Sequence, residues 1–224
     1  ESVGTGYLVG TNLSSYGGFR ESVLGNPSIL PEKSRKTNLG FDAAFFGSNL
    51  SFSGDVFFEE TTGIITTLNN IPAILGTRLT PTGNAGIVEN KGFELELGYG
   101  RNDKSFKYRI SGNVAYAKNK IIDMQEQEYP FAHNYRTGNP VGSKYGLEWL
   151  GFFNDDTDIS SSPVQTYGPV KPGDLKYSDI TDDDQIDIDD IAMIGKSWMP
   201  ELSYGGNIFL SFKGFDFNAL LQGI

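Results

Sequence analysis

The sequence predicts an all-β fold: an antiparallel, up-and-down segment of a transmembrane β-barrel with long extracellular loops. Three observations support this prediction. Apolar and polar residues alternate along six segments, these segments are longer than ordinary globular strands, and the connections between them alternate between short and long. Glycine, at 28 of 224 residues, and aromatic residues, at 13%, are also abundant, and this balance favours antiparallel β structure.

The alternation places the apolar and polar side chains of each strand on opposite faces. In the first segment, Leu39, Phe41 and Phe45 alternate with Asn38 and Asp42, as the two-residue period of a strand requires. Most segments exceed the usual strand length of about five to six residues. We expect six strands, at about residues 37–46, 50–60, 89–99, 106–118, 201–212 and 215–224.

The connections between these strands are sorted by length. Short connections rich in Gly or Asn occur at residues 47–49, 100–105 and 213–214, and such residues are typical of turns. Between them lie two long connections, residues 61–88 and 118–200. Transmembrane barrels sort their connections in this way because their periplasmic turns are short and their extracellular loops are long. Strand parity therefore predicts that both long connections lie outside the cell.

A half-buried sheet of a soluble protein shows the same alternation. The alternative is therefore a soluble β-domain for calcium-dependent carbohydrate binding or adhesion. The strand lengths and the parity of the connections favour the barrel. Because six strands cannot close a wide barrel, we expect the chain to be one portion of a larger barrel.

The composition excludes several classes of function. With 18 basic and 28 acidic residues, the chain has a net charge of −10 and lacks the basic footprint of a nucleic-acid-binding protein. It has no cysteine for a disulfide, a thiolate zinc site or a nucleophile. Its single histidine, His133, has no serine motif or partner for a catalytic triad. We therefore do not expect an enzyme.

An acidic segment, residues 179–190, fits the spacing of a twelve-residue calcium loop. Such a loop places oxygen ligands at positions 1, 3, 5, 7, 9 and 12 around one tight turn. Ile186 would be its apolar anchor, while Asp184 replaces the usual glycine at a position that favours φ > 0. The alternative is a solvated acidic loop that binds nothing specific. The candidate Ca²⁺ ligands are Asp179, Thr181, Asp183, the Gln185 carbonyl, Asp187 and Asp190.

Two aromatic residues of the second long connection are weak candidates for substrate contact. Tyr145 and Trp149 lie close to Phe152 and Phe153 in the sequence. Aromatic rings in loops stack well on sugars, but packing within the loop or at a membrane interface is a more frequent use of them. The sequence identifies no other substrate residue.

Several ordered segments resemble one family. Residues 26–34 (NPSILPEKS) are followed by residues 84–97 (NAGIVENKGFELEL), which form the most recognisable strand. Residues 138–146 (GNPVGSKYG) and 172–177 (PGDLKY) then come in the same order as in that family. The chain resembles the SusC/RagA-type TonB-dependent outer-membrane transporters from about residue 26 onward.

This resemblance implies a barrel of 22 strands with a plug in its lumen, located in the outer membrane of a Gram-negative-type cell. It also implies active import of glycans, oligosaccharides or peptides, energised through TonB, with a SusD-like lipoprotein as the external lid. Residues 1–224 match a C-terminal portion of such a barrel. The plug, the TonB box and the signal peptide have no counterpart in this sequence.

Overall fold

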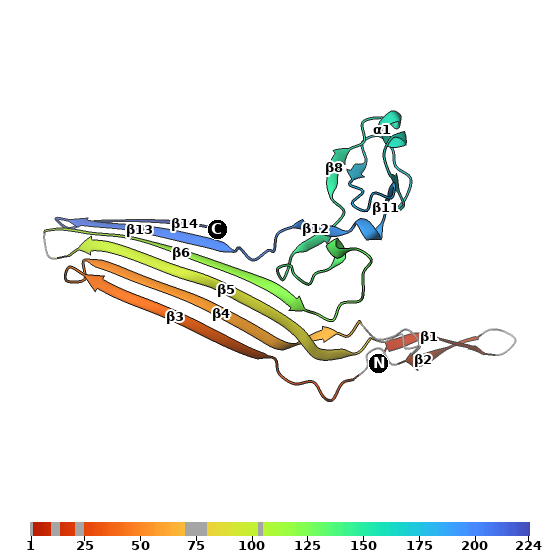
Figure 1. Cartoon of the computed structure of the whole chain (residues 1–224), viewed down its shortest axis with the longest axis horizontal. Helices are drawn as coiled ribbons and strands as arrows, with labels where there is room; N and C mark the ends of the chain where they lie inside the picture. The colour runs from red at the N-terminus through yellow and green to blue at the C-terminus, as the bar shows by residue number, and fades with distance from the viewer. Residues whose placement is uncertain (1, 10–13, 21–24, 70–79, 103–104) are drawn as a thin grey trace.

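The computed structural model describes residues 2–9, 14–20, 25–69, 80–102 and 105–224, and its main feature is one antiparallel sheet of six long strands (Figure 1). The order across the sheet is β14-β13-β6-β5-β4-β3, so strands that follow one another along the chain are neighbours. The strands are β3 (Lys33–Phe45), β4 (Leu50–Thr67), β5 (Thr82–Arg101), β6 (Phe106–Asp123), β13 (Leu202–Phe212) and β14 (Phe215–Gly223). The predicted up-and-down antiparallel fold is confirmed.

The turns after β3 and β13 lie at the same end of the sheet, and the connection of residues 124–201 lies at the other end (Figure 1). Lys213 and Gly214 join β13 to β14 with φ values of 50° and 85°. Two consecutive positive φ values are typical of the tight hairpin turn whose twist matches that of the strands. The turn after β3 also uses left-handed residues, Phe46, Gly47 and Ser48. In the connection between β5 and β6, residues 103–104 lie outside the described residues.

The predicted strand limits need correction at the end with the long connections. The loops predicted at residues 61–88 and 118–200 are narrower in the structure, because β4 continues to Thr67, β5 begins at Thr82 and β6 continues to Asp123. In the structure, the two long connections are residues 68–81 and residues 124–201. Residues 70–79 of the first connection lie outside the described residues. Pairing between Val88 and Ile121 shows that the ladder extends well past the predicted ends.

Residues 124–201 form a folded loop rather than an irregular connection. The 3-10 turn η2 (Ala132–Asn134) comes first, and a two-stranded stalk of β7 (Lys144–Gly146) and β12 (Ala192–Gly195) follows it. The stalk carries a tip that contains the remaining short elements. They are β8 (Trp149–Phe152), α1 (Asp156–Ser160), β9 (Val164–Gln165), β10 (Leu175–Tyr177), β11 (Gln185–Ile186) and the 3-10 turn η3 (Ile188–Asp190).

A hairpin that the sequence analysis did not predict precedes the sheet. Strands β1 (Ser2–Val9) and β2 (Ser14–Arg20) pair only with each other and lie at the end with the long connections (Figure 1). No helix among the described residues is long and apolar enough to span a membrane.

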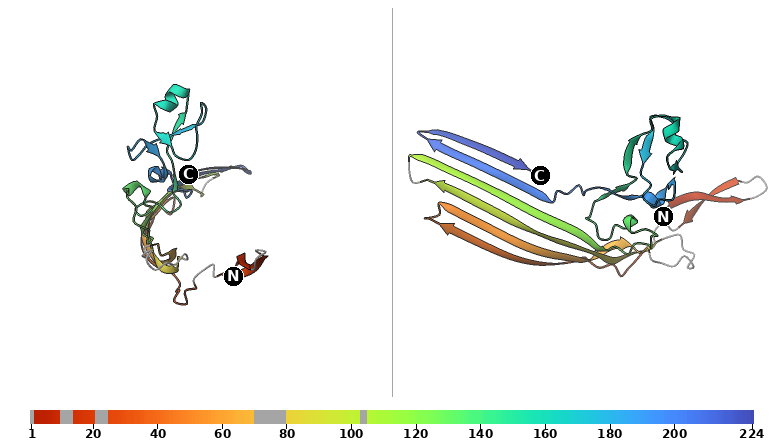
Figure 2. Two further views of the ribbon diagram at one scale, coloured as in Figure 1. Left: turned by 90° about the vertical axis from the view of Figure 1, so that its right-hand side faces the viewer. Right: turned by 45° about the horizontal axis from the view of Figure 1, so that its top comes forward.

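The six-stranded sheet is curved and open, with β3 and β14 as its two edges (Figure 2). Burial in the sheet is very low for a chain of this length. Among the residues whose burial the structure describes, the buried side chains other than glycine are Ile121, Phe153, Ile186 and Asp190. Soluble monomers rarely expose an apolar face of this extent, which argues against the soluble-domain alternative.

Candidate functional site

The apolar face of the sheet is built from rows that run across the strands in register. Because paired residues share a face, one row passes from Leu39 through Val56, Phe93 and Tyr116 to Leu202. The next two rows are Phe41, Gly54, Leu95, Val114 and Tyr204, and then Ala43, Phe52, Leu97, Gly112, Gly206 and Leu221. Leu39 is 73% exposed and Leu97 is 55% exposed, so this face meets its environment directly.

Aromatic rings gather on this face at the end with the short turns. Tyr108 contacts Tyr99 and Phe106, with ring centroids 5.9 and 6.0 Å apart. Phe106 also contacts Phe212 at 6.2 Å. A second aromatic contact, Phe93 with Tyr116 at 5.8 Å, lies farther along the strands. Aromatic residues at both edges of an outward apolar band are typical of transmembrane barrels.

The opposite face is polar and carries carboxylates at its centre. Asp55 pairs across the strands with Glu94, and the neighbouring Ser53 pairs with Glu96. The Ser53 hydroxyl donates to the Asp42 carboxylate at 2.6 Å. The side chains of Ser53, Asp55, Glu94 and Glu96 are among those that line a hollow with a volume of ≈ 790 Å³ on the sheet. Such a surface can bind water and hydrated polar solutes, as the lumen of a barrel does.

The base of the folded loop is anchored on the last residues of β6. There the backbone of Ile121 exchanges hydrogen bonds with the loop, donating to Asn139 at 2.9 Å and accepting from Gly138 at 2.8 Å. The Asn119 side chain accepts from the Val141 amide at 2.7 Å. The Glu126 carboxylate accepts two backbone amides, those of residues 136 and 137. The base therefore continues the ladder of the sheet beyond the point where β13 ends.

Tyr145 lies inside this base and supports it. Its hydroxyl donates to the Tyr135 carbonyl at 3.0 Å and accepts from Asn139 at 2.8 Å. Burial raises the pKa of the Tyr145 phenol, and the negative charge of Glu126 acts in the same direction. The Arg136 guanidinium lies 5.4 Å from the centre of the ring. These contacts give Tyr145 a packing role in the loop.

Trp149 lies on the tip and has different contacts. It is 58% exposed, its ring contacts Phe152 at 5.6 Å, and its indole N–H donates to the Gly151 carbonyl at 2.6 Å. Phe152 pairs across the strands with Leu175, so their side chains share a face. We call Trp149, Phe152 and Leu175 the tip patch. All three are exposed, whereas Tyr145 is not, so the two weak substrate candidates do not form one site.

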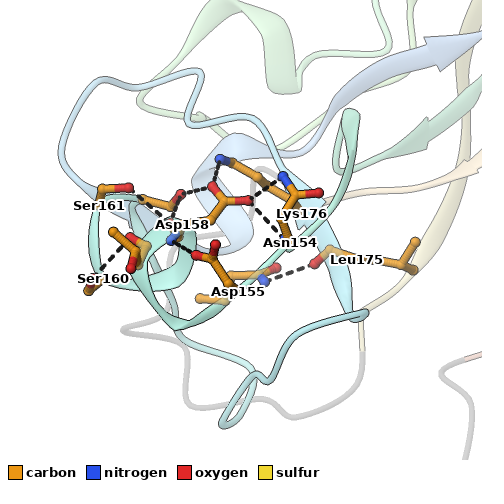
Figure 3. A network of polar contacts seen from close by, with 10 residues as sticks. Asn154, Asp155, Asp158, Ser160, Ser161, Leu175 and Lys176 are labelled. Carbon is orange, nitrogen blue, oxygen red and sulfur yellow. Dashed lines mark hydrogen bonds and ion pairs between the residues drawn. The ribbon is translucent and has the colours of Figure 1, made fainter.

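A polar network fixes the short helix of the tip (Figure 3). The Asp155 side chain caps α1 by accepting the Asp158 amide at 2.8 Å. The Lys176 ammonium on β10 donates to the Asp158 carboxylate at 2.7 Å. This hydrogen bond holds the pKa of Asp158 below its ordinary value, and the Asn154 amide acts in the same direction. Lys176 thereby ties the helix to the neighbouring strand.

The acidic loop is organised around Asp190, which is fully buried. Its carboxylate accepts the amides of Ile180, Thr181 and Asp187 at 2.8, 3.1 and 2.9 Å. Burial raises the pKa of Asp190, but the backbone donors and the Thr181 hydroxyl outweigh it, so the pKa lies below the ordinary value. Ile186, the predicted apolar anchor, is 1% exposed.

The remaining predicted calcium ligands hydrogen-bond within the loop. The Asp179 carboxylate accepts the amides of Asp183 and Asp184, and Asp184 has the predicted positive φ, at 62°. In the part of the chain that the structure describes, no group of three or more acidic or histidine side chains is arranged to hold a metal ion. The six-ligand calcium site, which also includes Thr181, Gln185 and Asp187, stays a prediction.

Two residues that the sequence analysis did not select join the base of the loop to the acidic segment. The His133 ring nitrogen Nε2 lies 2.7 Å from the Asp189 carbonyl oxygen. The Asn134 amide donates to the same oxygen at 3.1 Å and to the Ile191 carbonyl at 2.9 Å. No local signal could have found this contact, because the partners lie more than fifty residues apart. His133 has a structural role here.

Comparison with known proteins agrees with the sequence resemblance on the family and with the structure on the fold. The protein-family model described as TonB dependent receptor-like, beta-barrel matches residues 2–198. TonB-dependent receptor P26 from Formosa agariphila is 27% identical over 210 residues. That alignment covers 88% of this chain and 21% of the relative, so the chain spans about a fifth of the relative's length.

Solved structures share the fold over almost the whole chain. The RagAB peptide importer in the open-open state matches 98% of this chain, at 20% identity and a TM-score of 0.65, over 23% of its own chain. The RagAB peptide transporter matches 99%, at 21% identity and a TM-score of 0.62, over 24% of its chain. At 20% and 21% sequence identity, the likeness to these structures shows a shared fold.

Proposed function

This chain belongs to the TonB-dependent receptor-like β-barrel family, and on that premise we propose that it is part of an active importer energised through TonB. The family places it in the outer membrane of a Gram-negative-type cell. The observation that best supports the proposal is the in-register separation of the two faces over six strands. One face suits lipid, and the other suits a polar lumen.

We propose that residues 1–224 form a C-terminal portion of a plugged barrel of 22 strands, in which the polar face borders the lumen. The plug, the TonB box and the signal peptide would belong to parts of the protein outside this sequence. The carboxylates around Asp55 and Glu94 would then face the plug and the substrate path. The family is one of receptors and transporters, and we propose no catalytic activity for the chain.

The proposed cargo is a glycan, an oligosaccharide or a peptide. The structural neighbours are peptide importers, which supports peptides as the first class to test. The proposed partner is a SusD-like surface lipoprotein that contacts the folded loop. The tip patch supports this, because exposed apolar side chains on a projecting loop mark an interaction surface.

An uptake measurement on the full-length protein tests the importer proposal. Cells that carry the intact gene should accumulate labelled oligopeptides or oligosaccharides, and cells that lack the gene should not. Disabling TonB should abolish uptake and leave surface binding of the cargo unchanged. Uptake that does not depend on TonB, or that persists without the gene, would refute the proposal.

Replacing the tip tests the partner proposal separately. Gly146 pairs with Ala192 in the stalk, so residues 148–190 can be replaced by Asn-Gly, which forms a two-residue hairpin turn. The shortened protein should assemble in the membrane but no longer co-purify with the lipoprotein. A second variant, Trp149→Ser with Phe152→Ser in the full-length loop, removes the two aromatic rings of the patch without shortening the loop and should also reduce co-purification. Co-purification that survives both changes would contradict a lipoprotein contact at the tip.

A further inference from the structure

The apolar face of the sheet ends in a group of basic side chains. On the lipid-facing side of the strands, the row beyond Leu39 and Phe93 contains Thr37, Phe58, Lys91 and Lys118. The row after that contains Arg35, Glu60, Glu89 and Lys120. We call Arg35, Lys91, Lys118 and Lys120 the basic belt. All four side chains are exposed, and the chain as a whole carries a net charge of −10.

Lys91 and Lys118 stand directly opposite each other on β5 and β6. Like charges directly opposite each other in a cross-strand pair destabilise a sheet. In the part of the chain that the structure describes, Lys176 and Asp158 form the ion pair within 4 Å, and no such pair involves the belt. Glu60 and Glu89 offset two of its four charges across the strands, which leaves the Lys91 and Lys118 charges in excess.

The position of the belt matches the edge of a membrane. Lys118 follows Phe106, in the aromatic group at the short-turn end, by twelve residues on β6, which is about 40 Å along the strand. At a strand tilt of about 40° this becomes about 30 Å along the membrane normal. The apolar band of a transmembrane barrel is about 25 Å tall, so the belt lies just beyond it. Anionic head groups lie at that height.

We propose that the basic belt binds phosphate groups of anionic lipid in the outer leaflet of the membrane. This rests on the proposed function, because the belt reaches lipid only if the apolar face does. The lysine stems extend over the last apolar row while their ammonium groups reach the head groups. Lys91 and Lys118 then share one phosphate, which removes the repulsion between them.

The test uses the purified full-length protein in a neutral detergent and measures lipid retention by native mass spectrometry. The probes are diphosphorylated lipid A, phosphatidylcholine as a neutral lipid, and inorganic pyrophosphate as an anion without acyl chains. The wild type should retain lipid A in preference to both other probes. Lys91→Gln with Lys118→Gln should weaken lipid A binding by about 30-fold, since each lysine near an anionic surface contributes about fivefold.

Two matched variants control for charge and for folding. Lys36→Gln with Lys107→Gln removes the same charge from the polar face, since both residues pair on that side, and should leave lipid A binding unchanged. Lys91→Arg with Lys118→Arg keeps the charge and should keep binding. Equal binding by the belt variant and the wild type would overturn the inference. An equal loss of lipid A binding in the belt variant and in the polar-face control would also overturn the inference. Pyrophosphate binding as tight as that of lipid A would overturn it as well.

A failure of the proposed function has a different signature. If the apolar face did not meet lipid, arginine substitutions in its centre would not impair membrane assembly. If only the belt inference is wrong, those substitutions still impair assembly, while the belt variant binds lipid A as the wild type does.

Discussion

Of the four side chains that are buried among the residues whose burial the structure describes, Phe153, Ile186 and Asp190 lie in the folded loop, and Ile121 lies at its base. The central rows of the six-stranded sheet contain none. Yet the sheet has the longer and more regular hydrogen-bond ladders. The two regions of one chain therefore depend on different sources of stability.

The difference shows what each region needs from its surroundings. The inner strands of the sheet satisfy their backbone by pairing, but the edges β3 and β14 need the rest of the barrel, and the apolar face needs lipid. The loop supplies its own small core and a polar network that includes Asp190 and Asn134. Changes on the apolar face should affect assembly in the membrane, while changes in the loop should remain local.

The largest expected effect comes from a charge placed in the middle of the apolar face. Leu95→Arg or Leu97→Arg should cost about 2–4 kcal/mol and block assembly of the full-length protein, because the bilayer centre does not solvate the guanidinium. Assembly is measured by the amount of folded protein in outer-membrane fractions. Glu96→Arg, one position away on the polar face, is the control and should assemble. Normal assembly of both leucine variants would mean that this face does not meet lipid.

The next effect should be confined to the loop. Asp190→Ala removes the acceptor for three backbone amides in a buried position, which costs about 1–3 kcal/mol locally. Protease cleavage within residues 179–190 should become faster in intact protein, with no change in barrel assembly. Asp189→Ala is the matched control, since among the described residues Asp189 holds the loop through its backbone, which the change leaves in place. If the Asp190 variant assembled poorly, the two regions would not be independent.

Acid should loosen the loop before it affects the sheet. The folded pKa of Asp190 lies below the ordinary value of 3.8, so its contribution to stability is full above about pH 4 and is lost as the pH falls through the lower folded value. Pepsin cleavage of the loop, followed from pH 5 to pH 2, should rise in this range. In Asp190→Asn this step should be absent. An identical pH profile in both proteins would assign the acid response to other groups.

A calcium titration gives the smallest expected structural change. If residues 179–190 bind Ca²⁺, the ion should stiffen the loop and leave the strands unchanged. Asp183→Ala with Asp187→Ala should abolish the calorimetric heat, although the second change also removes the side-chain cap of η3. Protease access in calcium and in chelator provides the second readout. Without binding heat or protection, the segment would be a hydrogen-bonded acidic loop only.

The alternation of apolar and polar residues predicted the strands correctly where the two faces of the sheet meet different environments. It did not predict the strand ends, where both faces are polar. Leu39 and Phe93 stand out against their polar neighbours, so the centre of the sheet was predicted in correct order. Beyond Lys91 the outward face becomes charged, and the two-residue pattern disappears although the ladder continues to Asp123. The long strand ends could therefore not be inferred from hydropathy.

The folded loop could be predicted from the sequence only where its contacts join residues that are close together along the chain. The spacing of residues 179–190 predicted the buried anchor Ile186 and the positive φ of Asp184, because both follow from a tight acidic turn. The contacts of His133 with Asp189 and of Lys176 with Asp158 join positions that are distant in the sequence. Only the folded chain brings these groups together.

The bulges of the sheet have a consequence for how such sequences can diverge. Register shifts occur next to Thr62, Ile64 and Val88, all at the end with the long connections, and the ladders of β3 with β4 and of β13 with both neighbours have none. A one-residue insertion in the regular part would invert every later side chain of that strand. Natural insertions and deletions should therefore accumulate in the strand ends between Thr62 and the long connections. In the regular part of the sheet, toward the short turns, they should occur in pairs.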